Sequence, residues 1–504
     1  MKRFILTFCL ILFLSVTLIF AGGGKEKGKA EKVIRVAEQV PGLITPGVWD
    51  GQAFSMNSSI YEFLVEMNSD TSLLEPLLAT SWHNDDGSRW TFNLRQDVYF
   101  HDGSPFTAED VKFTIERTQD PSIGHLKKQD FEIVESIETP DPYTVVINLR
   151  EPRPTFIYQL TDYNMAILSS EYDYERYGET KPMGTGPFVL ERLIPKEAAQ
   201  LVKNTNYWDS AYPIVDGINI YFVPDIEASI SMLESGQVDI VPFVSQVIGK
   251  RLKESNDDIE IISPYQEMRF ISMRVDEEPF NDNRVRLALK YAMDPYIIAR
   301  SVAQMELGDG VYYNETPIMN LLPQYKEIDL RRRDIDKAKE LLTEAGYPNG
   351  FEVDLYYASD HPFGKELSQT VQELALEAGI RINLKGYTRD VYLAQYWLNV
   401  PLSITGWAGR PDVSMLLHLA FRGGGSWNES HIDAPVLNTL IDKISVESDE
   451  DLRLRYYHQL QDFFFEEGSL INVQVPLLIA TSKRVVNYRH PLTQIPQYKY
   501  FDLK

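Results

Sequence analysis

Hydrophobic and polar residues follow two different periods along this chain, and each period predicts one kind of element. In the segment 90–95, WTFNLR, every second residue is apolar, which is typical of a half-buried strand. The turn sequence NDDG at 84–87 precedes this segment, so we expect a hairpin from Trp82 to Leu94. A short strand is also expected at 33–37, VIRVA, where the folded part of the chain begins.

Segments with a helical period alternate with these strands. After Asp334, which is a favourable N-cap, apolar residues recur at 338, 341, 342 and 345 before a glycine and a proline end the predicted helix. A capping-box pattern at Thr107 predicts the start of another helix. A further short helix and the two strands that flank it are expected at 371–378, 351–355 and 380–384. This alternation predicts an α/β architecture.

The N-terminus has the order of a secretory signal peptide. Lys2 and Arg3 supply a positive end, Phe4 to Phe20 form an uncharged apolar stretch, and Ala21 stands at the expected cleavage site. We therefore expect 1–21 to be a signal peptide and 22–32 to be a flexible spacer. The apolar stretch is also nearly long enough to cross a bilayer, which leaves an uncleaved membrane anchor as the alternative. Both interpretations place the rest of the chain in the periplasm or the extracellular space.

Cysteine use and charge exclude several functional classes. Cys9 is the only cysteine, and it lies inside the apolar stretch, whereas a lipoprotein signal needs a cysteine at its end. Once the signal is removed, no cysteine remains for a disulfide, thiol catalysis or a thiolate metal site. The net charge of −24 repels phosphate backbones, so we expect no nucleic-acid partner and interpret the charge as a source of solubility.

The sequence also lacks the common motifs of catalysis. It contains no GxSxG, HExxH or GxxxxGK[ST] pattern, and its eight histidines do not have metal-ligand spacing. We therefore expect a protein that is not an enzyme and that needs no cofactor and no metal.

The block from Leu78 to Arg117 resembles the signature region of the family 5 extracellular solute-binding proteins. This family includes the dipeptide-, oligopeptide- and nickel-binding receptors of ABC importers. The positions that match its usual pattern are Pro76, Leu78, Ala79, Ser81, Trp82, Gly87, Trp90, Phe92, Leu94, Arg95, Val98, Phe100, His101, Asp102, Gly103, Pro105, Phe106 and 107–111.

Further segments extend the resemblance over nearly all of 33–504. They match in the order in which the family has them: GTGPF at 184–188, NYW at 206–208, ESGQVD at 234–239, FNDNRVRLALKYAM at 280–293 and the segment 337–351. Most matched residues are expected to be structural, with Trp82, Trp90 and Phe92 in a core and His101 satisfied by backbone groups. Gly184 and Gly186 either allow a special turn or bring the backbone close to the ligand.

The resemblance implies a two-lobed, periplasmic-binding-protein-like fold of the class II type with an additional third subdomain. Lobe I would comprise 33–60, 184–265 and 480–504, the extra subdomain 61–183, and lobe II 266–479. Two chain crossings between the lobes would form a hinge, which suits capture of a ligand by closure.

By resemblance, the candidate ligand-binding residues lie in loops. Trp49 is in the N-terminal loop that faces the cleft in this family, and Trp407 is in the segment TGWAGRPD at 405–412. We expect Trp407 either to stack on the ligand or to pack within its own lobe. The other candidates are Tyr163, Asn164, Arg410, Asp412, Trp427 and Asn428.

Arg410 departs most from the family's dipeptide-binding pattern. In that pattern an aspartate after the GW pair holds the amino group of the ligand, whereas Gly409 and Arg410 stand here and Asp412 follows two residues later. Arg410 either grips a ligand carboxylate in a bidentate way or forms a salt bridge with Asp412 or another neighbouring acid.

The favoured function is a monomeric receptor that captures a short peptide by lobe closure and delivers it to the permease subunits of an ABC importer. An oligosaccharide is the alternative ligand, because aromatic residues make up 12% of the chain and suit sugar faces as well as peptide side chains. Trp49 and Trp407 facing each other across a cleft would favour the sugar. A nickel ligand is disfavoured by the sparse histidines. A secreted hydrolase is the alternative from a different class.

Overall fold

The structure is a computed structural model that describes residues 31–48, 54–69, 73–303, 307, 311–359, 363–408, 412–489 and 496–504. The chain divides into two compact units, Met1–Lys32 and Val33–Lys504. The expected signal peptide and residues 22–30 of the expected spacer lie outside the described residues. Within the described part of the chain, no helix has the length and apolar character needed to span a membrane.

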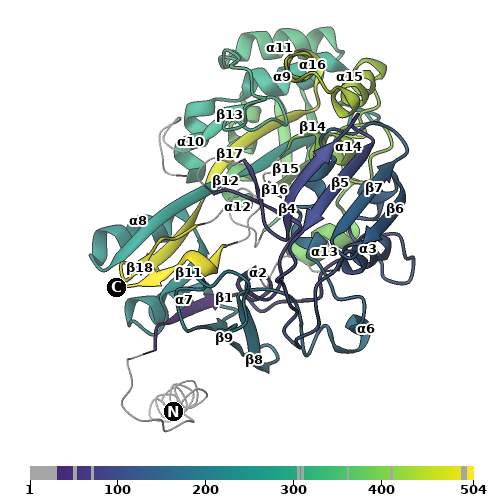
Figure 1. The fold of residues 1–504 in the computed structure, drawn as a ribbon. Helices are drawn as coiled ribbons and strands as arrows, with labels where there is room; N and C mark the ends of the chain where they lie inside the picture. The colour runs from purple at the N-terminus through teal and green to yellow at the C-terminus, as the bar shows by residue number, and fades with distance from the viewer. Residues whose placement is uncertain are drawn as a thin grey trace, which may run out of the picture. The chain divides into compact units, whose positions relative to one another are not determined.

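One mixed sheet of 11 strands runs through the described residues of Val33–Lys504 (Figure 1). Its strands are β1 (Val33–Glu38), β8 (Phe188–Ile194), β9 (Ala198–Lys203), β10 (Gly217–Phe222), β11 (Ile240–Val244), β12 (Ile259–Met273), β13 (Tyr312–Asn314), β14 (Phe351–Ala358), β15 (Ile380–Tyr387), β16 (Leu402–Ala408) and β17 (Leu470–Ser482). They are ordered β15-β14-β16-β12-β17-β11-β1-β10-β9-β8, and β13 pairs with β17.

The sheet contains two parallel groups of strands. In the N-terminal parallel group, β1 lies between β10 and β11 and runs parallel to both. In the C-terminal parallel group, β14 lies between β15 and β16 and runs parallel to both. The long antiparallel strands β12 and β17 connect the groups, since β17 pairs with β11 and β12 pairs with β16.

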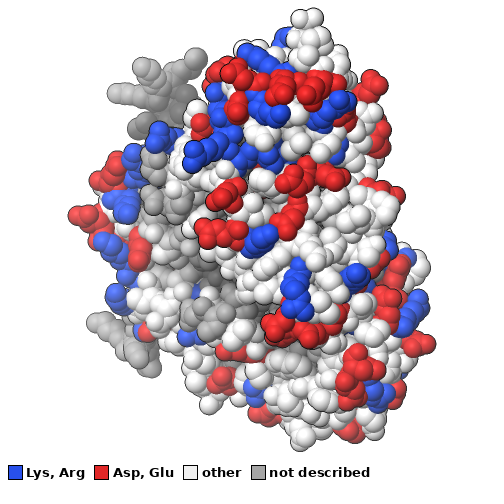
Figure 2. Space-filling model, turned by 90° about the horizontal axis from the view of Figure 1, so that it is seen from above, with Lys and Arg blue, Asp and Glu red and all other residues white. Residues whose placement is uncertain are grey.

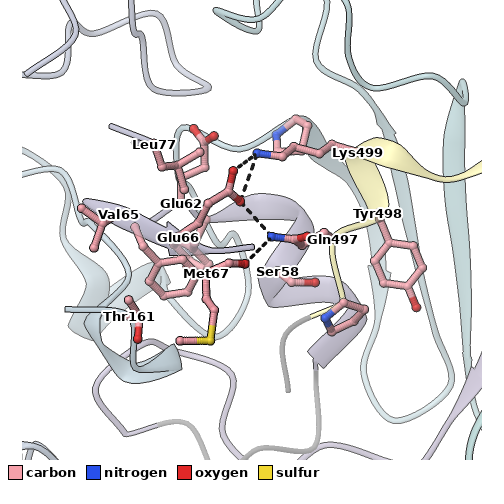
Figure 3. Close-up of a pocket in the computed structure, with 14 residues that line it drawn as sticks. Ser58, Glu62, Val65, Glu66, Met67, Leu77, Thr161, Gln497, Tyr498 and Lys499 are labelled. Carbon is pink, nitrogen blue, oxygen red and sulfur yellow. Dashed lines mark hydrogen bonds and ion pairs between the residues drawn. The ribbon is translucent and has the colours of Figure 1, made fainter. Parts of the chain in front are cut away.

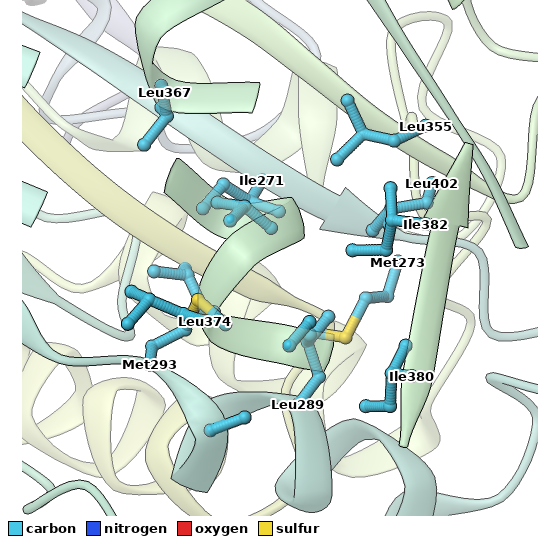
Figure 4. Close-up of a cluster of buried hydrophobic side chains, with 14 of the residues drawn as sticks. Ile271, Met273, Leu289, Met293, Leu355, Leu367, Leu374, Ile380, Ile382 and Leu402 are labelled. Atoms are coloured by element: carbon cyan, nitrogen blue, oxygen red, sulfur yellow. The ribbon is translucent and has the colours of Figure 1, made fainter. Parts of the chain in front are cut away.

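Each parallel group has its own apolar core. Helices α2 (Phe54–Ile60), α7 (Ile226–Glu234) and α8 (Gln246–Ser255) accompany the N-terminal parallel group, where Ile34, Val36 and Ile218 are fully buried. On one face of the C-terminal parallel group, helices cover a core that includes Ile271, Leu289 and Leu355 (Figure 4). These helices are α9 (Asn283–Ala292), α10 (Pro295–Ala303), α11 (Ile335–Glu344) and α12 (Gly364–Leu376).

The other face of the C-terminal parallel group carries a separate core. Trp407 and Phe270 pack there against α14 (Ser414–Ala420), α15 (Pro435–Val446) and α16 (Glu450–Glu467). We call this the Trp407 core. Helix α13 (Arg389–Gln395) follows β15.

A second, four-stranded sheet forms a unit with its own core. Its strands are ordered β4-β5-β7-β6, and α3 (Ala108–Arg117), α4 (Lys128–Phe131) and α5 (Phe156–Gln159) belong to the same unit. Trp90 and Phe92 are buried in this core, while Trp82 is half-buried at its edge. The strands are β4 (Ala79–Asn84), β5 (Arg89–Leu94), β6 (Val134–Asp141) and β7 (Thr144–Leu149).

Short elements complete the chain. They are β2 (Val65–Met67) paired with β3 (Leu74–Pro76), β18 (Val485–Val486) paired with β19 (Asp502–Leu503), α6 (Tyr174–Tyr177), and the 3₁₀ turns η1 (Tyr163–Met165) and η2 (Tyr498–Tyr500).

The structure confirms most of the local predictions. The predicted hairpin is formed by β4 and β5. Thr107 and Asp110 form the predicted capping box of α3, and the Asp334 carboxylate accepts the backbone N–H of Lys337 at the start of α11. Helix α12 starts seven residues earlier than predicted, at Gly364, because Leu367 lies on the same buried face as Val371 and Leu374.

Acidic and basic side chains are interspersed on the face shown in Figure 2, and wide areas between them carry neither. Such a distribution agrees with the interpretation of the net charge as a source of solubility.

Candidate functional site

The carboxyl ends of the parallel strands indicate where a ligand would bind. In open α/β sheets, ligands bind in the crevice outside these ends, where loops leave the strands. Here β16 ends at Ala408, directly before the loop that carries Arg410, and the loop after β1 leads to Trp49. Both Trp49 and Arg410 lie outside the described residues. Their proposed contacts with the ligand, including any pairing of Trp49 with Trp407, stay predictions.

Three aromatic rings meet beside the N-terminal parallel group. The ring of Phe54 contacts that of Tyr163 edge-on, with centroids 5.9 Å apart, and that of Phe243, with centroids 6.2 Å apart. All three side chains are half-buried. Phe243 has φ 61°, a left-handed conformation that costs energy for a residue with a side chain and often marks functional sites. Phe54 and Tyr163 also pack against the core of the N-terminal parallel group.

Asn164 anchors the loop that follows β1. Its side-chain oxygen accepts the backbone N–H of Gly47 at 3.1 Å, while the side chain itself is buried. Gly47 has φ 97°, and a Cβ there would lie 2.5 Å from the ring of His125, so only glycine fits. Burial, with help from the nearby charge of Arg117, lowers the pKa of His125 to about 4. Asn164 therefore holds the loop that follows β1 in place. Its contact with a ligand stays a prediction.

Three tryptophans surround a buried carboxylate in the Trp407 core. The indole N–H groups of Trp397 and Trp407 both donate to Oε1 of Glu429, each at 2.9 Å. The ring of Trp427 lies 5.6 Å from that of Trp397 and 5.7 Å from that of Trp407. Burial raises the pKa of Glu429, although hydrogen bonds to its charged form oppose the shift. We call Trp397, Trp407, Trp427 and Glu429 the tryptophan cluster.

The tryptophan cluster fixes the orientation of Trp407. Only 5% of Trp407 is exposed, and its ring also packs 5.9 Å from that of Phe270. Trp427 and Trp397 are half-buried and therefore present more ring surface to solvent than Trp407 does. The sequence drew attention to Trp407 and Trp427, and the structure brings these two together.

Asn428 and Asp412 both hold their own loops. The amide of Asn428 donates to the carbonyl of Ile432 at 2.8 Å, and its oxygen accepts the backbone N–H of the same residue. Asp412 is buried, and its Oδ1 accepts the backbone N–H of Ser414 at 2.9 Å and the hydroxyl of Tyr457 at 3.2 Å. Both side chains have partners within their own loops, and their ligand roles stay predictions.

The GTGPF turn packs closely on helix α2. A Cβ on Gly184 or Gly186 would lie 2.3 or 2.5 Å from the carbonyl oxygen of Ile60, so these glycines allow two backbone segments to touch. Nε2 of His101 lies 3.0 Å from the carbonyl of Gly186, which agrees with the expected backbone partner. The geometry therefore favours the structural interpretation of this turn.

Three tyrosines, two near the ends of β14 and β15 and one directly after α13, were not singled out by the sequence. The rings of Tyr387 and Tyr396 stack 4.2 Å apart, and Tyr356 lies 5.3 Å from Tyr396. All three are half-buried. The two strand-end tyrosines come close because β14 and β15 are parallel and adjacent, which only the pairing of the strands reveals.

A pocket lies beside β2 and the C-terminal segment (Figure 3). Its water-accessible volume is about 50 Å³, which suffices for a few water molecules. Lys499 pairs with Glu66 at 3.0 Å, and the carboxylate of Glu62 accepts bonds from Tyr207 and Thr185. Burial raises the pKa of Glu62 to about 7. Because these charged groups already have partners, the pocket offers a ligand little to bind.

Comparison with known proteins identifies the family. Residues 74–428 match the family described as "Bacterial extracellular solute-binding proteins, family 5 Middle", which is more than half of the chain. The chain belongs to this family. The resemblance seen in the sequence is thereby confirmed.

Several curated family 5 relatives are similar over most of their length. The heme-binding protein A of Haemophilus influenzae is 28% identical over 460 residues, which cover 84% of this chain and 83% of the relative. The glutathione-binding protein of Escherichia coli K12 is 28% identical over 453 residues, which cover 85% and 86%.

Solved structures of binding proteins have the same fold. A periplasmic binding protein from Agrobacterium tumefaciens R10 in complex with agropinic acid matches with a TM-score of 0.82 at 23% identity, over 94% of this chain and 98% of the other. One from Helicobacter pylori in complex with the peptide STSA matches with a TM-score of 0.81 at 24% identity, with the same coverage. The expected two-lobed fold with a third subdomain is confirmed.

Family membership decides between the classes of function. Family 5 proteins are substrate-binding proteins of ABC importers, not enzymes, and they act in the periplasm or outside the cell. The hydrolase alternative is therefore set aside. Among the described residues, no three His, Cys, Asp or Glu side chains are grouped so that they could hold a metal ion.

Proposed function

We propose that this protein captures a short peptide between its two lobes and delivers it to the permease subunits of an ABC importer. The proposal is carried by membership of the family of solute-binding proteins, and half-buried aromatic rings beside both parallel groups of strands support it. Phe54, Tyr163 and Phe243 lie beside one parallel group, and the tryptophan cluster lies beside the other. Flat apolar rings with polar edges suit peptide side chains.

The proposed lobes follow the boundaries expected from the sequence. Lobe I takes in 33–60, 184–265 and 480–504, the extra subdomain 61–183, and lobe II 266–479. The separate apolar cores of the two parallel groups support the division into lobes, while the core of the N-terminal parallel group also takes in Phe63, Leu77 and Leu168 of the proposed extra subdomain. The strands β12 and β17 cross between the lobes and are the proposed hinge.

The environment of Trp407 removes one argument for an oligosaccharide. Sugar sites stack an open aromatic face on a pyranose ring, whereas the face of Trp407 is packed between Phe270 and Trp427. Two relatives also bind peptides by name, since one binds glutathione and one was solved with the peptide STSA.

Purified protein of residues 22–504 is expected to melt at a higher temperature in the presence of its ligand. A ligand that binds only the folded state stabilises it by about 2.7 kcal/mol at a concentration of 100 times its Kd. Thermal-shift measurements with di- to hexapeptides, glutathione and oligosaccharides test this. A rise of the melting temperature with sugars but not with peptides would identify an oligosaccharide as the ligand. No rise with either class would contradict the proposal.

The mature protein is expected to begin near Gly22 and to carry no lipid, because no cysteine stands at the end of the apolar stretch. Intact-mass measurement on protein from its native envelope tests this. A retained Met1 would establish the uncleaved anchor instead, and a mass increase equal to acyl chains would establish a lipoprotein.

A further inference from the structure

The backbone of a short turn directly before Trp49 is hydrogen-bonded to the proposed extra subdomain. The turn comprises residues 44–47, which follow β1 in the proposed lobe I, belong to no helix or strand, and are all buried. Buried backbone N–H groups need partners, because an unpaired one costs free energy comparable to a lost hydrogen bond. The partners of this turn therefore show which part of the molecule determines its position.

Every N–H group of the turn donates to a side chain of the extra subdomain. The carboxylate of Glu179 accepts the N–H of Ile44 at 3.0 Å and that of Thr45 at 2.8 Å. The next residue is a proline without an N–H, and the N–H of Gly47 donates to the side-chain oxygen of Asn164 at 3.1 Å. The two bonds to Glu179 are charge-assisted, which makes them stronger than bonds between neutral groups.

A carbonyl group and the packing of the turn involve the same subdomain. The backbone N–H of Leu126 donates to the carbonyl of Gly47 at 2.9 Å. A Cβ on Gly178 would lie 2.5 Å from the hydroxyl oxygen of Thr45, so the segment before Glu179 approaches the turn as closely as only glycine allows. Together with Asn164, three separate segments of the extra subdomain therefore contact the turn.

Lobe I supplies the other attachment of the turn. The side chain of Ile44 is buried in the core of the N-terminal parallel group, and its carbonyl accepts the side-chain amide of Asn57 on α2 at 2.8 Å. The turn is thus fixed to lobe I on one side and to the extra subdomain on the other. A change in the extra subdomain therefore reaches the segment at Trp49 through bonds that involve no ligand.

We propose that the extra subdomain sets the ligand specificity of the receptor by positioning this turn, with Glu179 and Asn164 as its positioning residues. The inference rests on the proposed function, because the turn leads directly to the candidate ligand residue Trp49. A turn held in one conformation is ordered before the ligand arrives, so binding loses less conformational entropy. Loss of an anchor weakens the binding of ligands that contact the following residues and spares the others. Asn164 acts through Gly47 and does not touch the ligand.

Hydrogen exchange tests the positioning of the turn without any ligand. In the Glu179→Ala variant, the N–H groups of Ile44 and Thr45 lose their acceptor. Their exchange is expected to accelerate about tenfold or more, the factor that corresponds to a hydrogen bond to a charged group. Mass spectrometry of peptides that cover 39–48 measures this exchange. Equal exchange in the variant and the parent would overturn the role of Glu179.

Two matched variants separate the lost acceptor from the lost charge. Glu179→Gln should exchange like the parent, because Oε1 alone accepts from both N–H groups and an amide oxygen can do the same. Glu135→Ala removes an exposed carboxylate from β6 of the same subdomain and should also exchange like the parent. Acceleration in the glutamine variant as large as in the alanine variant would overturn the assignment of Glu179 as an acceptor.

Calorimetric titration with several compounds tests the effect on specificity. The compounds are glutathione, the tripeptides Phe-Ala-Ala and Ala-Ala-Phe, and maltotriose. Glu179→Ala and Asn164→Ala are expected to weaken the binding of the same compounds, by about two- to thirtyfold relative to the others. Glu179→Gln and Glu135→Ala should keep every affinity within about twofold of the parent. An equal loss for all compounds that bind, or different preferences in the two alanine variants, would overturn the role in specificity.

The two measurements distinguish this proposal from the peptide proposal. If neither glutathione nor a tripeptide binds while the exchange behaves as expected, the peptide proposal fails and the positioning of the turn stands. If peptides bind but the exchange of the turn is the same in Glu179→Ala and the parent, the peptide proposal stands and the positioning fails. If the exchange accelerates and every affinity stays within about twofold of the parent, the turn is anchored but has no role in specificity.

Discussion

Glu429→Ala is expected to lower the free energy of unfolding by about 2–5 kcal/mol. The substitution leaves the half-buried indole N–H of Trp397 and the buried indole N–H of Trp407 without their acceptor, and an unpaired buried donor costs about 1–3 kcal/mol. It also empties the space of a carboxylate inside the Trp407 core. Denaturant unfolding followed by tryptophan fluorescence measures both the loss of stability and the changed environment of the indoles.

Glu429→Gln is the matched control, because both indoles donate to one oxygen and an amide oxygen can accept both bonds. The folded protein raises the pKa of Glu429, so its ionised form costs stability, and this cost appears as the pH rises above the ordinary carboxyl range. The glutamine variant should therefore equal or exceed the parent in stability at pH 7 and lose that advantage as the pH falls below the ordinary value of 4.5. A loss with glutamine as large as with alanine would contradict this account of the tryptophan cluster.

Local signals let the sequence predict individual elements well. The hairpin of β4 and β5 depends on a turn and on alternation within 16 residues of chain, and both are visible in the sequence. The capping box of Thr107 with Asp110 and the N-cap at Asp334 are contacts between residues three apart. Such contacts form wherever the right residue types stand at the right spacing.

Contacts between distant segments could not be predicted in the same way. Glu429 carries no local signal of its role, which depends on Trp397 and Trp407 being brought to it by α13, β16 and the loop after α14. The bond of Thr155 with Ser414 and the stack of Tyr387 with Tyr396, which follows α13, have the same character. Their partners are set by the strand order of the sheet, which alternation alone does not specify.

The family pattern identified residues of the candidate site but not their individual roles. It directed attention to Trp407, Trp427 and Asp412, which lie together on the C-terminal parallel group. The pattern did not distinguish a side chain that touches ligand from one that positions its neighbours. Buried partners make that distinction, since the hydrogen bonds of Asp412 and Asn428 are made within the protein.

Arg410→Ala is expected to weaken binding of the best peptide by about 2–5 kcal/mol, which is about 30-fold to a few thousandfold in Kd. We propose that Arg410 grips a carboxylate of the ligand in a bidentate, charge-assisted bond, so truncation also leaves the ligand's charge unpaired in a cleft with little water. The alternative is a salt bridge of Arg410 to Asp412, whose Oδ1 accepts bonds from Ser414 and Tyr457.

Calorimetric titration of Arg410→Ala and Arg410→Lys, with a melting curve for each, separates the two roles of Arg410. Lysine should restore only part of the affinity, since a point charge cannot reproduce the fork of a guanidinium. Arg251→Ala is the control, because Arg251 pairs with Glu227 on the exposed surface and should leave the affinity unchanged. An Arg410→Ala affinity within about twofold of the parent, or roughly 0.4 kcal/mol, together with a lower melting temperature, would assign Arg410 to its own loop. A large loss of affinity at an unchanged melting temperature is the result that only a ligand contact explains, because a residue that merely braces its loop stabilises the free protein as well.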